Sequence, residues 1–199
     1  MLPSDARGAS CARGQAYSVV SDLARIRLAY LAEILSIKLL AGQGRTKCGH
    51  CFKVWLLMRF YLDNCIFNRP FDDQSNTRVR LETEAKLYMQ QCIKEGKAEL
   101  VWSYILDFEN DQNPFEEKRT AIDKWKKLAV VDIEETDMLK KRADSYVAHG
   151  VKAKDALHVS AAIAGHADYF VTTDDRLLNK LCEMTEIQAA NPVDVVGGI

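Results

Sequence analysis

The sequence predicts an α/β domain in which a central, mostly parallel sheet is covered by helices on both faces. Short apolar segments alternate along the chain with longer stretches in which apolar residues recur at helical spacing. Turn and capping residues separate the two kinds of segment. Because parallel strands need a long crossover between them, this alternation favours a parallel sheet between two layers of helices.

The first half of this pattern begins with a short apolar and aromatic segment at residues 59–63, which is typical of a buried strand. A turn-rich loop, NRPFDDQSN, follows it. The next stretch, residues 78–95, predicts a helix that Gly96 ends. We expect the apolar face of this helix to consist of Leu81, Ala85, Tyr88 and Cys92.

Residues that start helices mark the second half of the pattern. Ser103 and Thr136 are predicted N-caps, and Pro114 suits the first turn of a helix at 114–128, with an apolar stripe of Ile122, Trp125 and Leu128. The other predicted helices are the stretch from Thr136 to about Gly150, residues 153–165 and residues 174–183. The other predicted strands are residues 98–102, 129–133, 169–172 and a short one near Ile187.

The net charge of −1 conceals two regions of opposite sign. Residues 1–57 contain eight Lys or Arg and three Asp or Glu, whereas residues 58–199 contain nineteen and twenty-five. The acidic second region argues against non-specific nucleic-acid binding, which needs many cationic side chains. It is compatible with a site in which bound metal ions supply the positive charge.

Cysteine usage and hydropathy indicate the compartment. Six scattered cysteines without a secretory signal predict reduced thiols in a cytoplasmic protein. No uninterrupted run of about 18 apolar residues is present, so we expect no membrane span. The Cys48–Cys51 pair has the Cys-x-x-Cys spacing, but neither a thioredoxin-like pattern nor two further zinc ligands accompany it.

Five acids come directly after a predicted strand or near the start of the following helix: Asp63, Glu109, Asp155, Asp174 and Asp175. In open α/β sheets the ligand site lies beyond the carboxyl ends of the strands, so all five could lie at one edge. Acids near a helix start also stabilise the helix by about 0.3–1 kcal/mol without any further role. Periodicity alone leaves both interpretations open.

The segments FYLDNCIFNRPF, LVWSYILDFEN and KAKDALHVSAAIAGHADYFVTTDDRLL resemble, in order and spacing, the PIN-domain family of metal-dependent ribonucleases. Asp63 and Asn64 match the acid and polar residue that end the family's first strand. Ser103 and Glu109 match the next strand end, and the segment from Asp155 to His158 matches Asp-Ala-Leu-His. The segment from Val171 to Asp174 matches Val-Thr-x-Asp, so the resemblance covers about residues 58–195.

The resemblance implies a PIN-like three-layer α/β/α fold and a site for Mg²⁺ or Mn²⁺. It implies that the catalytic and metal-holding set is Asp63, Glu109, Asp155 and Asp174. Residues that would support these ligands or position a phosphate are Asn64, Thr172, Thr173 and Asp175. The spacing from the strand favours Asp174 over Asp175 as the ligand. We expect His158 to be a structural residue rather than a general base, and Lys154 and Arg176 to be solvated unless they steer phosphates.

The function that the resemblance implies is a divalent-metal-dependent endoribonuclease similar to VapC-type toxins of toxin–antitoxin pairs. Its partners would be an RNA substrate, an antitoxin protein and a second copy of the chain, with no membrane. The helices at 78–95 and 114–128 would supply the protein-binding faces. The alternative is a catalytically silent PIN-like binding or scaffold module, and a structure-specific DNA nuclease is a third, less favoured reading.

Residues 1–57 lie outside the resemblance and predict a separate, poorly structured or helical extension. Residues 1–18 are rich in small and polar residues, and residues 21–40 show helical spacing. We favour an upstream extension of a protein that natively starts at Met58, where the domain 58–199 begins. An organellar targeting peptide or an amphipathic docking arm are the alternatives.

Overall fold

The computed structural model of the chain describes residues 58–196. The predictions for residues 1–57, including the helix at 21–40, the Cys48–Cys51 pair and the native start at Met58, fall on or next to a segment outside the described residues. None of the helices between residues 58 and 196 is long and apolar enough to cross a membrane. Within the same range, Cys65, Cys92 and Cys182 are free thiols.

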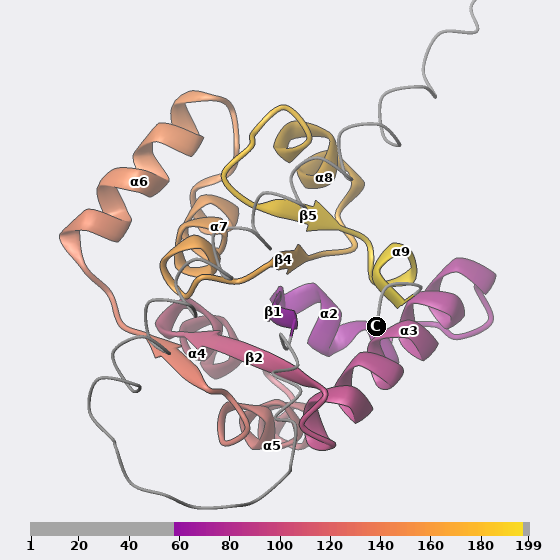
Figure 1. The fold of residues 1–199 in the computed structure, drawn as a ribbon. Coiled ribbons are helices and arrows are strands. Elements are labelled where there is room, and N and C mark those ends of the chain that lie inside the picture. The colour runs from indigo at the N-terminus through magenta and orange to yellow at the C-terminus, as the bar shows by residue number, and fades with distance from the viewer. Residues whose placement is uncertain (1–57, 197–199) are drawn as a thin grey trace, which may run out of the picture. The chain divides into compact units, whose positions relative to one another are not determined.

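Five parallel strands form the sheet at the centre of this domain. Their order is β3-β2-β1-β4-β5, so β1 lies in the middle (Figure 1). The bounds are Met58–Leu62 for β1, Ala98–Ser103 for β2, Val131–Ile133 for β3, Tyr169–Val171 for β4 and Gln188–Ala190 for β5. Consecutive residues of β1 and β2 are buried on both faces, as expected for a parallel sheet between helices.

Helices cover both faces of the sheet. The helix α7 packs against β2 and β4 and is covered in turn by α6, whereas α3 packs against β2 and α9 on the other side (Figure 1). The predicted α/β class and the three-layer α/β/α arrangement are therefore confirmed. The helical elements are α2 Asn64–Asn68, the 3-10 turn η1 Arg69–Phe71, α3 Thr77–Lys94, α4 Tyr104–Asp111, α5 Glu116–Lys126, α6 Asp137–Ala148, α7 Ala153–Ala164, α8 Asp175–Leu181 and α9 Pro192–Val196.

Aromatic side chains fill the core around β1. Tyr61 of β1 stacks on Phe170 of β4 with ring centroids 5.7 Å apart, and Phe67 meets Trp102 of β2 edge-on at 5.3 Å. All four are almost fully buried. Burying a side chain of this size stabilises the fold by roughly 1.5–3 kcal/mol, so these contacts hold the central strands in register.

The predicted buried face of α3 is partly wrong. Ala85 and Cys92 are buried, but Leu81 and Tyr88 are about half exposed. The helix instead buries Glu82, which lies 3.0 Å from Arg69 and 2.9 Å from Arg78 in two ion pairs. The apolar residues that α3 buries are Ala85, Met89, Cys92 and Ile93, which recur at helical spacing, so the buried face is rotated from the predicted one and includes Glu82 with its two partners.

Several helix ends differ from the predictions. Thr136 caps α6 as predicted, accepting a hydrogen bond from the Leu139 backbone N–H. Ser103 occupies the N-cap of α4, but its side chain makes no capping bond. Helix α5 starts after Phe115 and ends before Leu128, which is exposed. Helix α2 lies between β1 and the predicted loop, the loop contains η1, and neither α2 nor α9 was predicted; these two helices are each five residues long.

Gly165, directly after α7, is expected to tolerate no larger residue. A Cβ atom there would overlap Cγ1 of Val101, a fully buried residue of β2, and lie 3.3 Å from its Cγ2. We expect Gly165→Ala to lower the free energy of unfolding by about 1–3 kcal/mol, the usual cost of overpacking a core. Denaturant unfolding measures this, with Val101→Ala as the compensating change. If the two substitutions together cost as much as the sum of their separate effects, overlap with Val101 is not the cause.

Candidate metal centre

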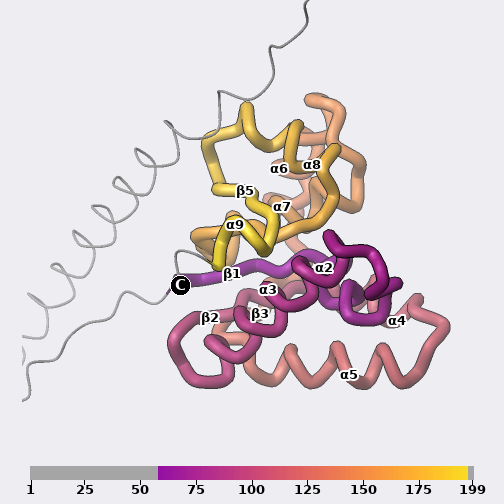
Figure 2. The backbone as a smooth tube through the Cα atoms, turned by 90° about the vertical axis from the view of Figure 1, so that its right-hand side faces the viewer, coloured from indigo at the N-terminus to yellow at the C-terminus, as the bar shows by residue number. Residues whose placement is uncertain are grey.

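The acids predicted to matter meet at the edge of the sheet where the parallel strands end. Asp63 directly follows β1, and its backbone N–H donates to the carbonyl oxygen of Val171 in β4 at 2.9 Å. Asp174 follows β4 by three residues, and Glu109 lies on α4, which begins where β2 ends. In Figure 2, β1 runs directly into α2, and α4 lies at this same end of the domain. The parallel topology therefore places three distant segments beside one another.

The carboxylate of Asp63 is held by hydrogen bonds to both oxygens. Its Oδ2 accepts from the Thr172 hydroxyl at 2.8 Å and from the Cys65 thiol at 3.2 Å. Its Oδ1 accepts from the Asn64 backbone N–H at 2.7 Å. Thr172 also accepts from the Asp174 backbone N–H at 3.2 Å, so one buried hydroxyl links the first and the last predicted acids.

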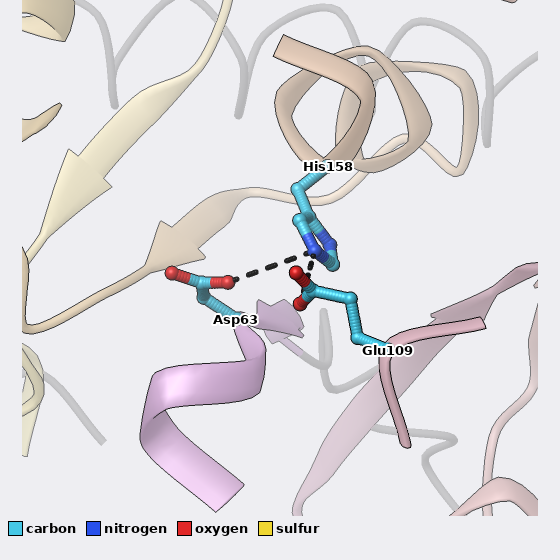
Figure 3. A group of neighbouring side chains, drawn as sticks. All are labelled: Asp63, Glu109 and His158. Carbon is cyan, nitrogen blue, oxygen red and sulfur yellow. Dashed lines mark hydrogen bonds and ion pairs between the residues drawn. The ribbon is translucent and has the colours of Figure 1, made fainter. Parts of the chain in front are cut away.

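Glu109 and Asp63 both face the imidazole of His158 on α7 (Figure 3). The Nε2 atom of His158 lies 3.0 Å from Glu109 Oε2 and 3.9 Å from Asp63 Oδ1. One potential ligand atom from each of the three residues lies within 4.8 Å of the other two. Burial acts to raise the pKa of Glu109, but the hydrogen bonds from His158 and Lys154 and the positive charge of Lys154 outweigh it and hold that pKa below its usual value.

A buried hydrogen-bond chain orients His158 from behind. Its Nδ1 lies 2.7 Å from the hydroxyl of Tyr61, which lies 2.6 Å from the hydroxyl of Ser103. Because an ionised carboxylate only accepts, we assign the imidazole proton to Nε2, so that Tyr61 donates to Nδ1. Burial raises the pKa of Tyr61 well above its usual value, so its hydroxyl stays protonated and can donate.

Asp155 and Asp174 complete the acidic edge. Burial raises the pKa of Asp155 above its usual value, and the nearby negative charges of Asp63 and Asp174 raise it further. Asp174 caps α8, because its Oδ1 accepts from the backbone N–H groups of Arg176 at 2.8 Å and Leu177 at 3.2 Å. Its Oδ2 lies 3.9 Å from the ammonium group of Lys152. Asp174 thus has a capping oxygen and a second oxygen near the lysine.

The structure separates Asp175 from its neighbour. Both Asp175 carboxylate oxygens bond to the guanidinium of Arg78 on α3, with Nη1 donating to Oδ2 at 2.6 Å. This pairing lowers the pKa of the exposed Asp175 carboxyl. Asp175 is engaged by α3 while Asp174 interacts electrostatically with Asp155, so the geometry favours Asp174 as the acid of the site.

The remaining predicted residues support the ligands through the backbone. Asn64 anchors Asp63 Oδ1 with its N–H, while its side-chain oxygen accepts from the Asn68 amide at 3.1 Å inside α2. The Thr173 backbone N–H donates to Cys65 Sγ at 3.4 Å, which steadies the thiol beside Asp63. The part of Asn64 and Thr173 in phosphate positioning stays a prediction.

Two further side chains contact the acids, His158 and Cys65. The ring nitrogen of His158 contacts Glu109 and approaches Asp63, which fits the prediction of a structural residue that orients a carboxylate. Its spacing three residues after Asp155 on one helix face was the available signal. For Cys65, nothing in the spacing distinguishes its thiol from those of the other cysteines. Only the start of α2 directs it back to Asp63.

The donor set fits a hard divalent cation. Asp63 and Glu109 lie together at His158, and Asp155 interacts electrostatically with Asp63 and Asp174. The lysines that contact these acids are exposed: Lys154 Nζ is 3.3 Å from Glu109 and Lys152 Nζ is 3.9 Å from Asp174. Clustered carboxylates repel one another unless a cation lies between them, and Mg²⁺ or Mn²⁺ prefers oxygen ligands. Asp63, Glu109, Asp155 and Asp174 would hold such an ion, with His158 orienting Glu109.

Comparison with known proteins finds a likeness in fold. No protein-family model matches the chain, and no curated protein matches it. The fold is similar to a crystal structure of VapBC2 from Rickettsia felis bound to a DNA fragment from its promoter. That likeness has a TM-score of 0.43 and 13% sequence identity, and it covers 67% of this chain and 98% of the other. The function is therefore inferred from the residues of the site and not from this likeness.

Proposed function

We propose that the protein is a PIN-type, divalent-metal-dependent endoribonuclease that hydrolyses RNA phosphodiester bonds. The observation that supports this proposal is the group formed by Asp63, Glu109 and His158 at one edge of the sheet, with Asp155 and Asp174 close enough to interact electrostatically. Asp63 and Glu109 share His158, and Asp155 interacts electrostatically with Asp63 and Asp174. Burial and the charges of Asp63 and Asp174 disfavour the ionised form of Asp155 in the metal-free fold, and this favours a role in binding Mg²⁺ or Mn²⁺.

Neighbouring side chains hold two of the proposed ligands, Asp63 and Glu109, in fixed orientations. A bound cation would supply a Lewis acid that favours ionisation of a water and stabilises charge on the leaving oxygen. Thr172 and Cys65 hold Asp63 in one orientation. His158, oriented by Tyr61, holds Glu109 and keeps it ionised. Such preorganised ligands place the reacting groups without reorganisation during the reaction.

The proposal includes a protein partner, as in toxin–antitoxin pairs. The outward face of α3 carries three apolar side chains that are about half exposed: Leu81, Leu87 and Tyr88. Large exposed apolar side chains grouped on one helix are typical of a protein-binding surface. We assign this face to an antitoxin or to a second copy of the chain. Leu81 and Tyr88, which the sequence spacing assigned to the buried stripe, belong to this outward face instead.

The proposal is tested by RNA cleavage with the purified full chain in Mg²⁺, in Mn²⁺ and in excess chelator. We expect cleavage only with metal, and we expect Asp63→Asn to slow it by about 10²–10³-fold, since it removes a charged ligand worth several kcal/mol. Asp73→Asn, in the exposed loop before α3, is the matched control and should be unchanged.

Failure of the parent protein to cut any single-stranded or structured RNA would contradict the proposal. If metal still raised the melting temperature in that case, and Asp63→Asn removed the effect, the metal-binding but catalytically silent module would be the better description. Equal cleavage by the parent and by Asp63→Asn would indicate a contaminating nuclease.

A further inference from the structure

Lys86 of α3 is a buried lysine without an acidic partner. Only 6% of its surface is exposed. Among residues 58–196, its ammonium group forms neither an ion pair nor a hydrogen bond. The acid best placed to pair with it, Glu82 one turn earlier, is already bound by Arg69 and Arg78. The charged form of Lys86 is therefore buried without compensation.

The surroundings of Lys86 favour its neutral form. Its Nζ lies 6.0 Å from the centre of the Trp125 ring of α5, whereas Lys94 Nζ lies 4.9 Å from the same ring centre. The indole therefore stabilises the Lys94 cation better, because this attraction needs a distance within about 6 Å. Burial first, and the positive charge of Lys94 second, lower the pKa of Lys86 to about 8. About a tenth of the amine is then neutral at pH 7, and a neutral lysine amine is a nucleophile.

A buried amide donor lies one turn after Lys86. Gln90 is 4% exposed, and its Nε2 group has no hydrogen-bond partner within the part of the chain that the structure describes. Residues four positions apart share one helix face, so this amide and the Lys86 amine lie on the same side of α3. A negatively charged acceptor at this place would satisfy the amide and would also attract the Lys94 ammonium group.

The group lies at the edge of the contact between α3 and α5. Lys94 is exposed and Trp125 is half-buried, so a small molecule reaches the Lys86 amine from this side. A molecule that arrives uncharged avoids the desolvation that opposes entry of an anion. Carbon dioxide is small and uncharged, and its adduct with an amine carries the negative charge that the site lacks.

We propose that Lys86 is a carbon dioxide site, at which the amine forms a carbamate held by Gln90 Nε2 and the Lys94 ammonium group. The nitrogen lone pair forms a bond to the carbon of CO₂, one C=O π pair moves onto oxygen, and the nitrogen loses one proton to water. The reaction turns a buried cation into an anion, so repulsion between the two lysines becomes attraction. None of these residues belongs to the candidate metal centre, so the inference does not depend on the ribonuclease proposal.

Trapping on the unmodified full chain tests the proposal directly. The protein is equilibrated with carbon-13-labelled CO₂ at constant pH, treated with an alkylating trialkyloxonium salt and mapped by peptide mass spectrometry. We expect at least about tenfold more labelled ester on Lys86 than on any other lysine, because ordinary lysines have a pKa near 10.4. The α-amino group of the chain, with an ordinary pKa of about 8, is the internal reference. Label on the α-amino group but not on Lys86 would refute the proposal.

Substitutions test the residues that hold the carbamate. Lys86→Met should abolish the label at this position, and Lys94→Ala or Gln90→Leu should each lower it about tenfold, since each removes a donor to the carbamate. Lys140→Met, which removes an exposed lysine paired with Glu135 on another face, is the matched control and should leave the label on Lys86 unchanged. Full labelling of both the Lys94→Ala and the Gln90→Leu proteins would overturn the assigned site.

Thermal unfolding provides a second readout. At constant pH and ionic strength, CO₂ with bicarbonate should raise the melting temperature of the parent by about 2–4 °C over sodium chloride. Lys86→Met should show no such rise. Inorganic phosphate tests the competing possibility of a simple anion site. If phosphate raised the melting temperature and no label formed on Lys86, the group would be an anion site and the carbamate proposal would be wrong.

Discussion

Asp174→Asn is expected to slow RNA cleavage by about 10²–10³-fold, whereas Asp175→Asn should change it less than threefold. The two neighbours differ because Asp174 lines a cavity beside Asp155 and interacts with it, while Asp175 is bound by Arg78 of α3. Asparagine is the right replacement at position 174, because it is also a preferred N-cap and keeps α8 in place. The substitution thus removes charge without removing the cap.

Steady-state cleavage of one linear RNA at several Mg²⁺ concentrations measures this difference. Far-UV circular dichroism and melting temperatures of both variants check that α8 remains folded. Comparable losses in the two variants would mean that the charge of the segment matters rather than the position of one carboxylate. A larger loss from Asp175→Asn would reverse the assignment of the ligand.

Asp155→Asn is expected to have opposite effects on activity and on stability. It should reduce cleavage at least about 100-fold, since it removes a proposed metal ligand. In the absence of metal it should raise the free energy of unfolding at pH 7, because burial and the charges of Asp63 and Asp174 disfavour the ionised Asp155. A residue that lowers the stability of the fold but is needed for activity is typical of functional sites.

The pH dependence follows from the direction of the pKa shift. The Asp155 pKa is higher in the folded protein than the ordinary value of 3.8, so the folded state binds more protons between these two values. Its stability therefore falls as the pH rises through that window, and the full cost remains at neutral pH. The gain from Asp155→Asn should be present at pH 7 and should disappear below about pH 3.8, where the carboxyl is neutral in both states.

Denaturant unfolding in chelator between pH 3 and pH 8 measures this gain, and repetition in Mg²⁺ should stabilise the parent more than the variant. Asp144→Asn on the exposed surface of α6 is the control and should show neither effect. If the variant proved less stable than the parent in chelator at pH 7, Asp155 would not be under repulsion from Asp63 and Asp174.

The local signals in the sequence were sufficient for most of the fold. Alternating strands and helices predicted the α/β class, and all five strands lie within three residues of their predicted places. Thr136 caps α6 because capping depends only on residues within the same turn. The elements that sequence reasoning missed, α2, η1 and α9, are short and carry no full turn of apolar periodicity.

Local structure and tertiary packing also determine different features of the site. Strand ends and helix starts identified five acids that can share one edge, Asp63, Glu109, Asp155, Asp174 and Asp175, and the resemblance to the PIN-domain family separated Asp175 from the other four. Tertiary packing decided which of them meet, through the pairing of β1 with β2 and β4. The same packing turned Asp175 toward Arg78 and placed His158 between two carboxylates.

The amino-acid sequence by itself thus determined the order of elements, the parallel architecture and the acids available at the strand ends. Only the tertiary structure decided the orientation of His158, the partner of Asp175, the exposed face of α3 and the cavity beside Asp155. The physical reason is that propensity, capping and periodicity act over one or two turns. Hydrogen bonds, ion pairs and cavities arise between residues up to about a hundred positions apart, as between Asp63 and Thr172.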